Sequence, residues 1–311
     1  MHAERDEERV GIGQGLIMDY FAVTPGDSTG LKLILNEQLA EAADAQFWYA
    51  LVDCAFDHGK QPLRLPDSTG FPIYHQGRLE ALSPVSPTLF ELATQDAKVL
   101  QQQLTRLLRH CSGRPMLSFI RSALPANVLR EYWQSLLEVE TADGDHYLLR
   151  FGDTRVLPTL GANPTIWSRL AAHAEAWCVI GREGHAITLA PPDTPEFDDR
   201  TLTIDNDCLA ALLTACRADA MADYLNTHFP DLLAPRDGAV NYAILAQVFQ
   251  LCDKHEIDRA SEQQALAVAV LLTDAHLLEA AGFDQWLSEK AWQPEGMAEA
   301  LADWMEEKEL V

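Results

Sequence analysis

A candidate nucleophile, Ser28, lies early in the chain, within Gly26-Asp27-Ser28-Thr29-Gly30. The G-x-S-x-G spacing exposes a serine hydroxyl when a strand runs into a strained turn and a helix follows, with acid and histidine partners further along the chain. Here residues 21–23 make only a short strand, and Pro25 stands where that strand should enter the turn. An ordinary surface turn rich in Asp, Ser and Gly is therefore the favoured interpretation. A serine hydrolase that uses Ser28 is the alternative.

The side chains that could bind a metal are dispersed along the sequence. The ten histidines form neither an H-E-x-x-H motif nor a tight cluster with cysteine, and the six cysteines include no C-x-x-C pair. Cys208 and Cys216 lie about two helical turns apart in an apolar segment, which is typical of core packing. The sequence also contains no phosphate-binding loop and no dinucleotide fingerprint. We therefore expect no metal, no cofactor and no enzymatic activity.

Arg150, Asp153 and Arg155 form a compact group of opposite charges where a strand is expected to end. Asp153 can cap the following turn, and its carboxylate can accept two parallel hydrogen bonds from an arginine. The three residues are therefore predicted to form an ion-pair corner that organises the first domain. The alternative is that they contact a partner directly.

The end of the chain combines aromatic residues with negative charge. Residues 258–311 contain 12 acidic residues and three basic ones, a net charge of −9. Large aromatic side chains in such a region form either a small core or an amphipathic docking face, and both interpretations stay open. A docking face bordered by carboxylates would suit a partner with basic, amphipathic helices. The candidate partner-binding residues are Trp286, Trp292, Trp304 and Met305.

The whole chain is acidic, with 23 basic and 47 acidic residues and a net charge of −24 at pH 7. Such a field repels phosphate backbones, so we expect no nucleic-acid partner. Residues 1–9 are charged, and no apolar run is long enough to span a membrane, so we expect neither a secretory signal nor membrane insertion. Together with unpaired cysteines inside apolar runs, these features predict a cytoplasmic protein.

Hydrophobic patterns predict an α+β protein, in which a mixed α/β domain precedes an all-helical domain. Asp96 and Pro125 mark the starts of two amphipathic helices, and Asp143-Gly144 predicts a hairpin. The predicted helices of the first domain are 31–43, 96–110, 126–138 and 164–175. The predicted strands are 47–54, 88–92, 116–120, 137–140, 147–151, 176–180 and 186–189, and residues 72–74 form a short segment of no assigned type.

Three prolines and four acidic residues in the span 190–200 predict a linker. Beyond it the patterns are helical, over about 206–226, 239–256, 261–281, 284–291 and 295–309. The predicted organisation is a mobile N-terminus at 1–15, an α/β domain at 16–189, a linker at 190–200 and a helical domain at 201–311.

Four motifs in residues 47–180 occur in the order found in a known family. They are Trp48-Tyr49-Ala50-Leu51-Val52-Asp53, Pro72-Ile73-Tyr74-His75-Gln76-Gly77, Ser86-Pro87-Thr88-Leu89 and Leu149-Arg150-Phe151-Gly152-Asp153-Thr154-Arg155-Val156-Leu157. This region resembles the conserved domain of the effector adaptors, or effector chaperones, of the bacterial type VI secretion system. Gly152 replaces the family's aromatic residue and Thr154 its proline, and these departures are expected to loosen the corner.

The resemblance implies a non-catalytic protein with two partners. It would bind a toxic effector inside the producing cell and load it onto the VgrG-type spike protein of the secretion machine. The family-motif positions that this implies are Trp48, Tyr49, Asp53, Tyr74, Gly77 and Pro87, and the corner Arg150, Phe151, Asp153 and Arg155. A competing interpretation is an immunity protein that blocks the active site of a toxin. The oligomeric state stays open.

Overall fold

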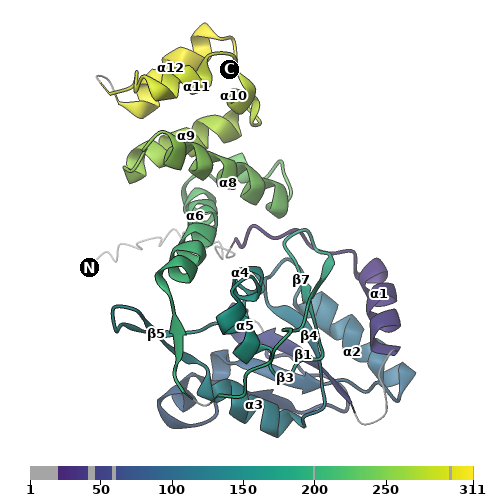
Figure 1. The fold of residues 1–311 in the computed structure, drawn as a ribbon. Helices are drawn as coiled ribbons and strands as arrows, with labels where there is room; N and C mark the ends of the chain where they lie inside the picture. The colour runs from purple at the N-terminus through teal and green to yellow at the C-terminus, as the bar shows by residue number, and fades with distance from the viewer. Residues whose placement is uncertain (1–19, 41–45, 58–60, 199, 294–295, 311) are drawn as a thin grey trace, which may run out of the picture.

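The chain is an α+β protein, as predicted, built from a sheet part and a helical part. The sheet part runs from α1 (Ser28–Ala40) to β9 (Leu202–Ile204), and the helical part from α6 (Asn206–His228) to α12 (Met297–Glu307). The structure is a computed structural model that describes residues 20–40, 46–57, 61–198, 200–293 and 296–310. The predicted mobile N-terminus at 1–15 lies outside these residues. Figure 1 shows the helical part stacked beyond one end of the sheet part.

One antiparallel sheet forms the centre of the sheet part, with the strand order β2-β3-β1-β4-β7-β8. Its strands are β1 Phe47–Asp53, β2 Gly70–Pro72, β3 Pro87–Glu91, β4 Leu117–Ser122, β7 Ala176–Ile180 and β8 Ala186–Leu189. In the middle of the sheet, Ala50 of β1 lies opposite Phe90 of β3 and Phe119 of β4. Five of the six strands were predicted from their aromatic and β-branched residues, most of them with shifted ends. β2 was not predicted as a strand and shares only Pro72 with the short segment expected at 72–74.

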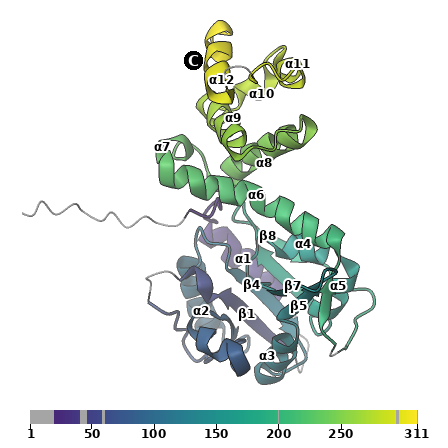
Figure 2. The ribbon, with the colours of Figure 1, turned by 90° about the vertical axis from the view of Figure 1, so that its left-hand side faces the viewer.

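Helices cover both faces of this sheet because alternate residues of β1 point to opposite sides. Trp48 and Val52 are buried in a core with α1 and α2 (Ala97–His110). Tyr49 and Leu51 are buried on the other face, in a core to which three further helices contribute. Those helices are α3 (Ala126–Ser135), α4 (Leu157–Gly161) and α5 (Pro164–Leu170). In Figure 2, α1 and α2 lie on one side of the strands and α4 and α5 on the other.

The predicted helix starts at Asp96 and Pro125 are confirmed. The Asp96 side chain accepts hydrogen bonds from the backbone N–H groups of Lys98 and Val99, which would otherwise lack partners at the start of α2. Leu104 and Leu107, on the buried stripe of α2, are fully buried in the core that α2 shares with the sheet and α1. Pro125 occupies the N-cap position of α3, which begins at Ala126.

A small second sheet corrects the prediction that residues 201–311 are wholly helical. Its order is β6-β5-β9, where β5 (Glu138–Thr141) and β6 (His146–Leu148) form the predicted hairpin. Gly144 adopts a φ of +83° in the hairpin turn. β9 pairs in parallel with β5, and its residues Leu202 and Ile204 are buried in the core of the sheet part. A three-residue alternation of apolar and polar residues is too short to be distinguished from loop by pattern alone.

The segment predicted as a linker, 190–200, is held against the sheet part by hydrogen bonds. The Trp167 indole Nε1 donates to Ala190 O at 2.7 Å, and the backbone N of Glu196 donates to Ser168 O at 2.9 Å. Arg169 Nη2 donates to Asp198 O, also at 2.9 Å. These bonds tie the segment to α5, so it serves as a strap rather than a free connection.

The helical part contains a core of its own, but α6 belongs to both cores. At its N-terminal end, Cys208 is buried in the core of the sheet part, and Leu212 packs against that core. At its C-terminal end, Met221 and Leu225 are buried among the helices that follow. The remaining helices are α7 Pro230–Leu233, α8 Gly238–Lys254, α9 Ala260–Leu272, α10 His276–Glu279 and α11 Phe283–Ser288. The predicted helix 261–281 is broken between α9 and α10, where Asp274 and Ala275 adopt positive φ values of 50° and 68°.

The segment from Tyr20 to Thr24 contacts both parts. The Tyr20 hydroxyl accepts a hydrogen bond from Asn241 Nδ2 of α8 at 2.7 Å. Thr24 N donates to Arg182 O in the β7–β8 turn at 2.7 Å, and the Thr24 hydroxyl accepts from Ala239 N of α8 at 3.1 Å. Residues before the first helix therefore help to join the sheet part to the helical part.

Candidate functional site

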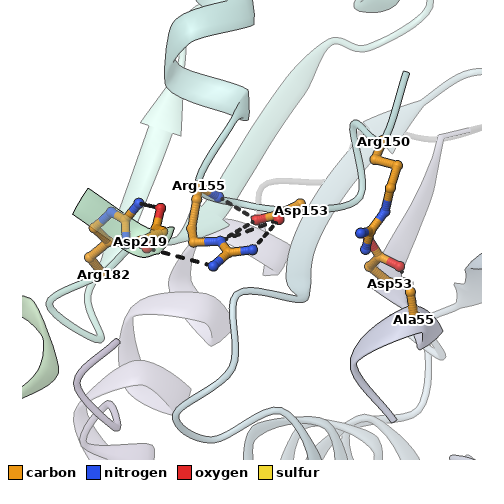
Figure 3. A network of polar contacts seen from close by, with 7 residues as sticks. All are labelled: Asp53, Ala55, Arg150, Asp153, Arg155, Arg182 and Asp219. Carbon is orange, nitrogen blue, oxygen red and sulfur yellow. Dashed lines mark hydrogen bonds and ion pairs between the residues drawn. The ribbon is translucent and has the colours of Figure 1, made fainter. Parts of the chain in front are cut away.

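The predicted corner at Asp153 is present in part. Asp153 is 6% exposed, and its carboxylate accepts Arg155 Nη2 at 2.7 Å and Arg155 Nε at 3.0 Å. The same carboxylate accepts the backbone N–H of Arg155 at 3.0 Å, so it also caps the turn. Figure 3 shows this pair between two further groups of charged residues. The prediction that Asp153 caps the turn and pairs with an arginine is confirmed for Arg155.

Arg150 belongs to a different ion pair, which corrects the predicted three-residue corner. Its Nη2 donates to Asp53 Oδ2 at 3.0 Å, at the end of β1 (Figure 3). Its guanidinium also lies 5.2 Å from the centre of the Phe56 ring. Asp53 was expected only as part of the strand motif, and the pair joins it to a residue 97 positions away in the chain. Such a long-range pair has no local sequence signal.

Asp53 is a fully buried carboxylate at 0% exposure. Burial raises its pKa above the ordinary value, and the positive charge of Arg150 offsets this effect only in part. The Ala55 backbone N–H donates to Asp53 Oδ1 at 3.1 Å, at the start of the 3₁₀ turn Cys54–Phe56. Asp53 therefore connects β1, this turn and the segment that carries Arg150.

The Asp153–Arg155 pair continues into the helical part. Arg155 Nη1 lies 3.6 Å from Asp219 Oδ1 on α6, and Asp219 in turn accepts two hydrogen bonds from Arg182, at 2.8 and 2.6 Å. The Arg182 guanidinium lies 3.6 Å from the centre of the Tyr242 ring on α8. We call Asp153, Arg155, Asp219 and Arg182 the charged ladder (Figure 3).

The carboxylates of Asp153 and Asp219 favour the charged form of Arg155 although its side chain is largely buried. Burial disfavours the charged form of Arg155, but its hydrogen bonds to Asp153 and the charges of Asp153 and Asp219 outweigh this, so the pKa of Arg155 is raised. Sequence reasoning missed Arg182, Asp219 and Tyr242. Arg182 lies in a hairpin turn and Asp219 within a mainly apolar helix, 37 residues apart, and no pattern in the sequence relates them.

The sheet part carries a family similarity that includes most of this network. A family model described as a domain of unknown function (DUF4123) matches residues 48–169, less than half of the chain. Residues 48–169 are similar to this domain. The matched domain begins in β1, ends in α5, and contains both Asp53–Arg150 and Asp153–Arg155. Asp219 and Arg182 lie outside it. No curated protein and no solved structure matches the chain.

Gly152 and Thr154, the two departures from the resembled motif, fit their local surroundings. A Cβ atom on Gly152 would lie 3.0 Å from Asp53 Cβ and 3.1 Å from Pro87 Cγ, so a larger side chain would require these neighbours to shift. The Thr154 N–H donates to Pro115 O at 3.0 Å, a bond that a proline at this position could not form.

The other motif positions of the matched domain have structural roles. Tyr49 is buried and its hydroxyl donates to Leu124 O at 2.8 Å, and the Tyr74 N–H donates to the Ser86 hydroxyl at 2.8 Å. Gly77 adopts a φ of +65° where a 3₁₀ segment, Gly77–Val85, begins. Pro87 lies opposite Asp53 in the β1–β3 pairing. Trp48 and Phe151 are also buried, at 3% and 0% exposure.

The tryptophans of the helical part form a core, and the alternative of an exposed docking face is corrected accordingly. Trp292 is 2% exposed, Trp304 8% and Met305 6%, and only Trp286 is partly exposed. Phe283 stacks on Trp286 with ring centres 6.0 Å apart, and Trp286 lies 5.6 Å from Trp292. The three buried side chains would have to leave this core to contact a partner, because their surface is already covered by neighbouring helices.

Ser28 lies at the exposed start of α1, and no strand precedes it in the described residues 20–27. Asp27 accepts the backbone N–H groups of Thr29 and Gly30, both at 3.0 Å, as expected for an ordinary capped turn. Sequence reasoning missed another serine, Ser288, whose hydroxyl oxygen lies 3.4 Å from His255 Nδ1. That hydroxyl donates to Asp284 O within α11 at 2.9 Å, so it is engaged with its own helix.

The described residues form neither a metal-binding cluster nor a membrane-spanning helix. Across the part of the chain that the structure describes, no three His, Cys, Asp or Glu side chains come together as they would around a metal ion. No helix within these residues combines the length and apolar character that a membrane crossing requires.

Proposed function

We propose that this chain is a non-catalytic adaptor that binds a type VI secretion effector in the producing cell and loads it onto the spike protein. The family model covers the region whose four motifs resemble those of effector adaptors. The observation that carries the proposal is the position of this matched domain, which is attached to a second core by α6 and by the charged ladder. A packed connection between two parts with separate surfaces suits a protein that must hold two partners at once.

The deciding experiment is co-purification of the full chain with a candidate effector and a spike protein encoded beside it. We expect both to be retained together, and the effector to be held through a segment outside its toxic domain. Deletion of that segment from the effector should abolish capture, and removal of the toxic domain should leave it unchanged. A wild-type chain that captures no effector, or captures it only through the toxic domain, contradicts the adaptor function.

The same complex distinguishes the adaptor from an immunity protein. An adaptor leaves the toxic activity of its bound effector intact, whereas an immunity protein occupies the active site and suppresses that activity. We expect the complex to retain the effector's activity in vitro. Measurement of ester turnover by the wild-type chain and Ser28→Ala tests the hydrolase alternative, and we expect no turnover that depends on Ser28.

A further inference from the structure

An open apolar groove lies between the end of α6 and helices α9 and α12. It has a volume of about 360 Å³, within the roughly 300–1,000 Å³ typical of binding clefts. Residues that line it include Tyr224, Phe229, Val268, Leu272, Ala298 and Ala302. Phe229 is 44% exposed and Leu272 54% exposed, so large apolar side chains face solvent here. In Figure 2, α12 and α9 lie together at the end of the molecule that is farthest from the sheet.

Small residues on α12 leave room for the backbone of another helix. Ala298 and Ala302 are four positions apart, so they lie on one face of α12, and both are exposed. Because the distance between packed helices depends on the side chains at the contact, alanines allow a close approach. Apolar walls beside a strip of alanines suit a helix that inserts one ridge of side chains.

The surface beside the groove is acidic. Glu299, Asp303 and Glu306 are exposed on α12, and Asp223 and Asp231 are exposed near the end of α6. The basic residues at the ends of these helices are already paired: Arg259 lies 3.6 Å from Glu262 and Lys308 lies 3.0 Å from Glu307. Negative charge beside an apolar groove favours an occupant with Lys or Arg next to its apolar ridge. A second copy of this chain, with its net charge of −24, would be repelled.

We propose that this groove binds an amphipathic helix whose apolar ridge is bordered by Lys and Arg. One part of the inference rests on the proposed function: the helix belongs to the effector and lies outside its toxic domain. The groove thus assigns effector capture to α6, α9 and α12 rather than to the tryptophan core, whose side chains are covered.

The probe is a synthetic amphipathic peptide of about 18 residues, with Leu at helical i, i+3, i+4 and i+7 spacing and Lys at the flanking positions. Its binding to the full chain is followed by fluorescence anisotropy, and its helix content by circular dichroism. We expect saturable binding with helix formation, and weaker binding as the salt concentration rises. A peptide with Glu in place of Lys, and one with scrambled order, should bind at least about tenfold more weakly.

Two substitutions at exposed positions should impair the groove without altering a buried residue. Leu272→Asp removes the exposed apolar side chain, and Ala302→Arg fills the groove and adds a repelling charge. Each should weaken peptide binding by about tenfold or more. Leu33→Asp is the matched control, because Leu33 is 64% exposed on α1 in the sheet part, and it should leave binding unchanged. If one groove variant unfolds, the other still tests the groove.

Three results would overturn the inference. The first is that the Glu or scrambled peptide binds as tightly as the Lys peptide, and the second is that both groove variants bind the Lys peptide as tightly as wild type does. The third is that the wild-type chain forms a dimer that Leu272→Asp dissociates. An experiment with the effector tests the groove separately from the adaptor function. Capture of the effector by wild type but not by Leu272→Asp or Ala302→Arg supports the groove as its site. Equal capture by all three overturns the assignment of the groove, and the adaptor function survives.

Discussion

Arg182 and Asp219 face each other across the boundary between the sheet part and the helical part. Two parallel hydrogen bonds, of 2.8 and 2.6 Å, join the guanidinium in the β7–β8 turn to the carboxylate on α6. The side chains are only 18% and 14% exposed, so water screens their attraction less than at an open surface. Since Arg182 also covers the Tyr242 ring, one hairpin turn holds both α6 and α8.

A double-mutant cycle with Arg182→Ala, Asp219→Ala and the double variant should reveal this coupling. We expect an interaction free energy of about 1–3 kcal/mol, because the pair is bidentate and mostly covered. Urea denaturation of the four proteins measures it. The matched control is Arg217–Asp253, a pair between α6 and α8 in which Asp253 is 56% exposed, and which should give about 0–1 kcal/mol. Equal values for the two pairs would show that the boundary pair has no special role.

Asp153→Ala should destabilise the sheet part. The substitution removes the nearer carboxylate partner of the largely buried Arg155 guanidinium, leaves Asp219 at 3.6 Å, and leaves the Arg155 N–H without its cap. We expect the free energy of unfolding to fall. Removal of one partner of a buried pair typically costs about 3–5 kcal/mol, and the loss here should lie at the lower end of that range. Thermal and urea denaturation measure it, with Asp143→Ala in the exposed hairpin turn as the control. A variant that unfolds like wild type yet loses its partner would make the corner an interface.

Asp53→Asn should change how stability depends on pH. Because burial raises the pKa of Asp53, the folded chain holds this proton more tightly than the unfolded chain does. The stability from this group is fully present below the unfolded value near 3.8 and is lost as pH rises through the folded pKa. The unfolding free energy of wild type minus that of Asp53→Asn should therefore fall as the pH is raised from about 4. Urea titrations at a series of pH values test it, and a difference that grows with pH contradicts it.

Gly238→Ala should destabilise the protein, although alanine is the better helix former. A Cβ atom at Gly238 would lie 2.5 Å from the Val23 backbone N, so the segment before α1 would have to move away from α8. We expect the free energy of unfolding to fall by about 1–3 kcal/mol, as it does when a packed site is overfilled. Gly161→Ala in α4 is the control, since its Cβ would meet Trp167 at an ordinary 3.9 Å, and it should be neutral or slightly stabilising. Melting temperatures of the two variants distinguish these outcomes.

Elements with strong local signals were predicted well. Asp96, the apolar stripe of α2 and the Asp143-Gly144 turn act within a few residues, and each produces the structure expected of it. β9 was missed because Leu202-Thr203-Ile204 becomes a strand only by pairing with β5, more than 60 residues earlier. The break after α9 was missed because nothing in that apolar pattern requires the positive φ values of Asp274 and Ala275.

The candidate site shows the same limit. Asp153 and Arg155 are two residues apart, and their pairing could be predicted from spacing alone. The partners of Arg150 and Arg182 could not, because each lies in an element that only the tertiary fold brings near. The core of the sheet part also extends beyond the predicted linker at 190–200, because both β9 and the first turns of α6 pack into it. A chain cut at residue 195 would lose them, so point variants test the two parts more cleanly than truncation does.

Helix α6 gives the molecule a lever. It has 23 residues and, at 1.5 Å per residue, is about 34 Å long. One end is packed into the sheet part and the other carries the helices that border the groove. A tilt of about 10° at the sheet would move the far end by about 6 Å, roughly one helical turn. The charged ladder meets α6 at Asp219, 13 residues or about 20 Å from the end that is packed into the sheet part, where a brace resists tilting with a long arm. The angle of the whole groove therefore depends on a few side chains around Asp219.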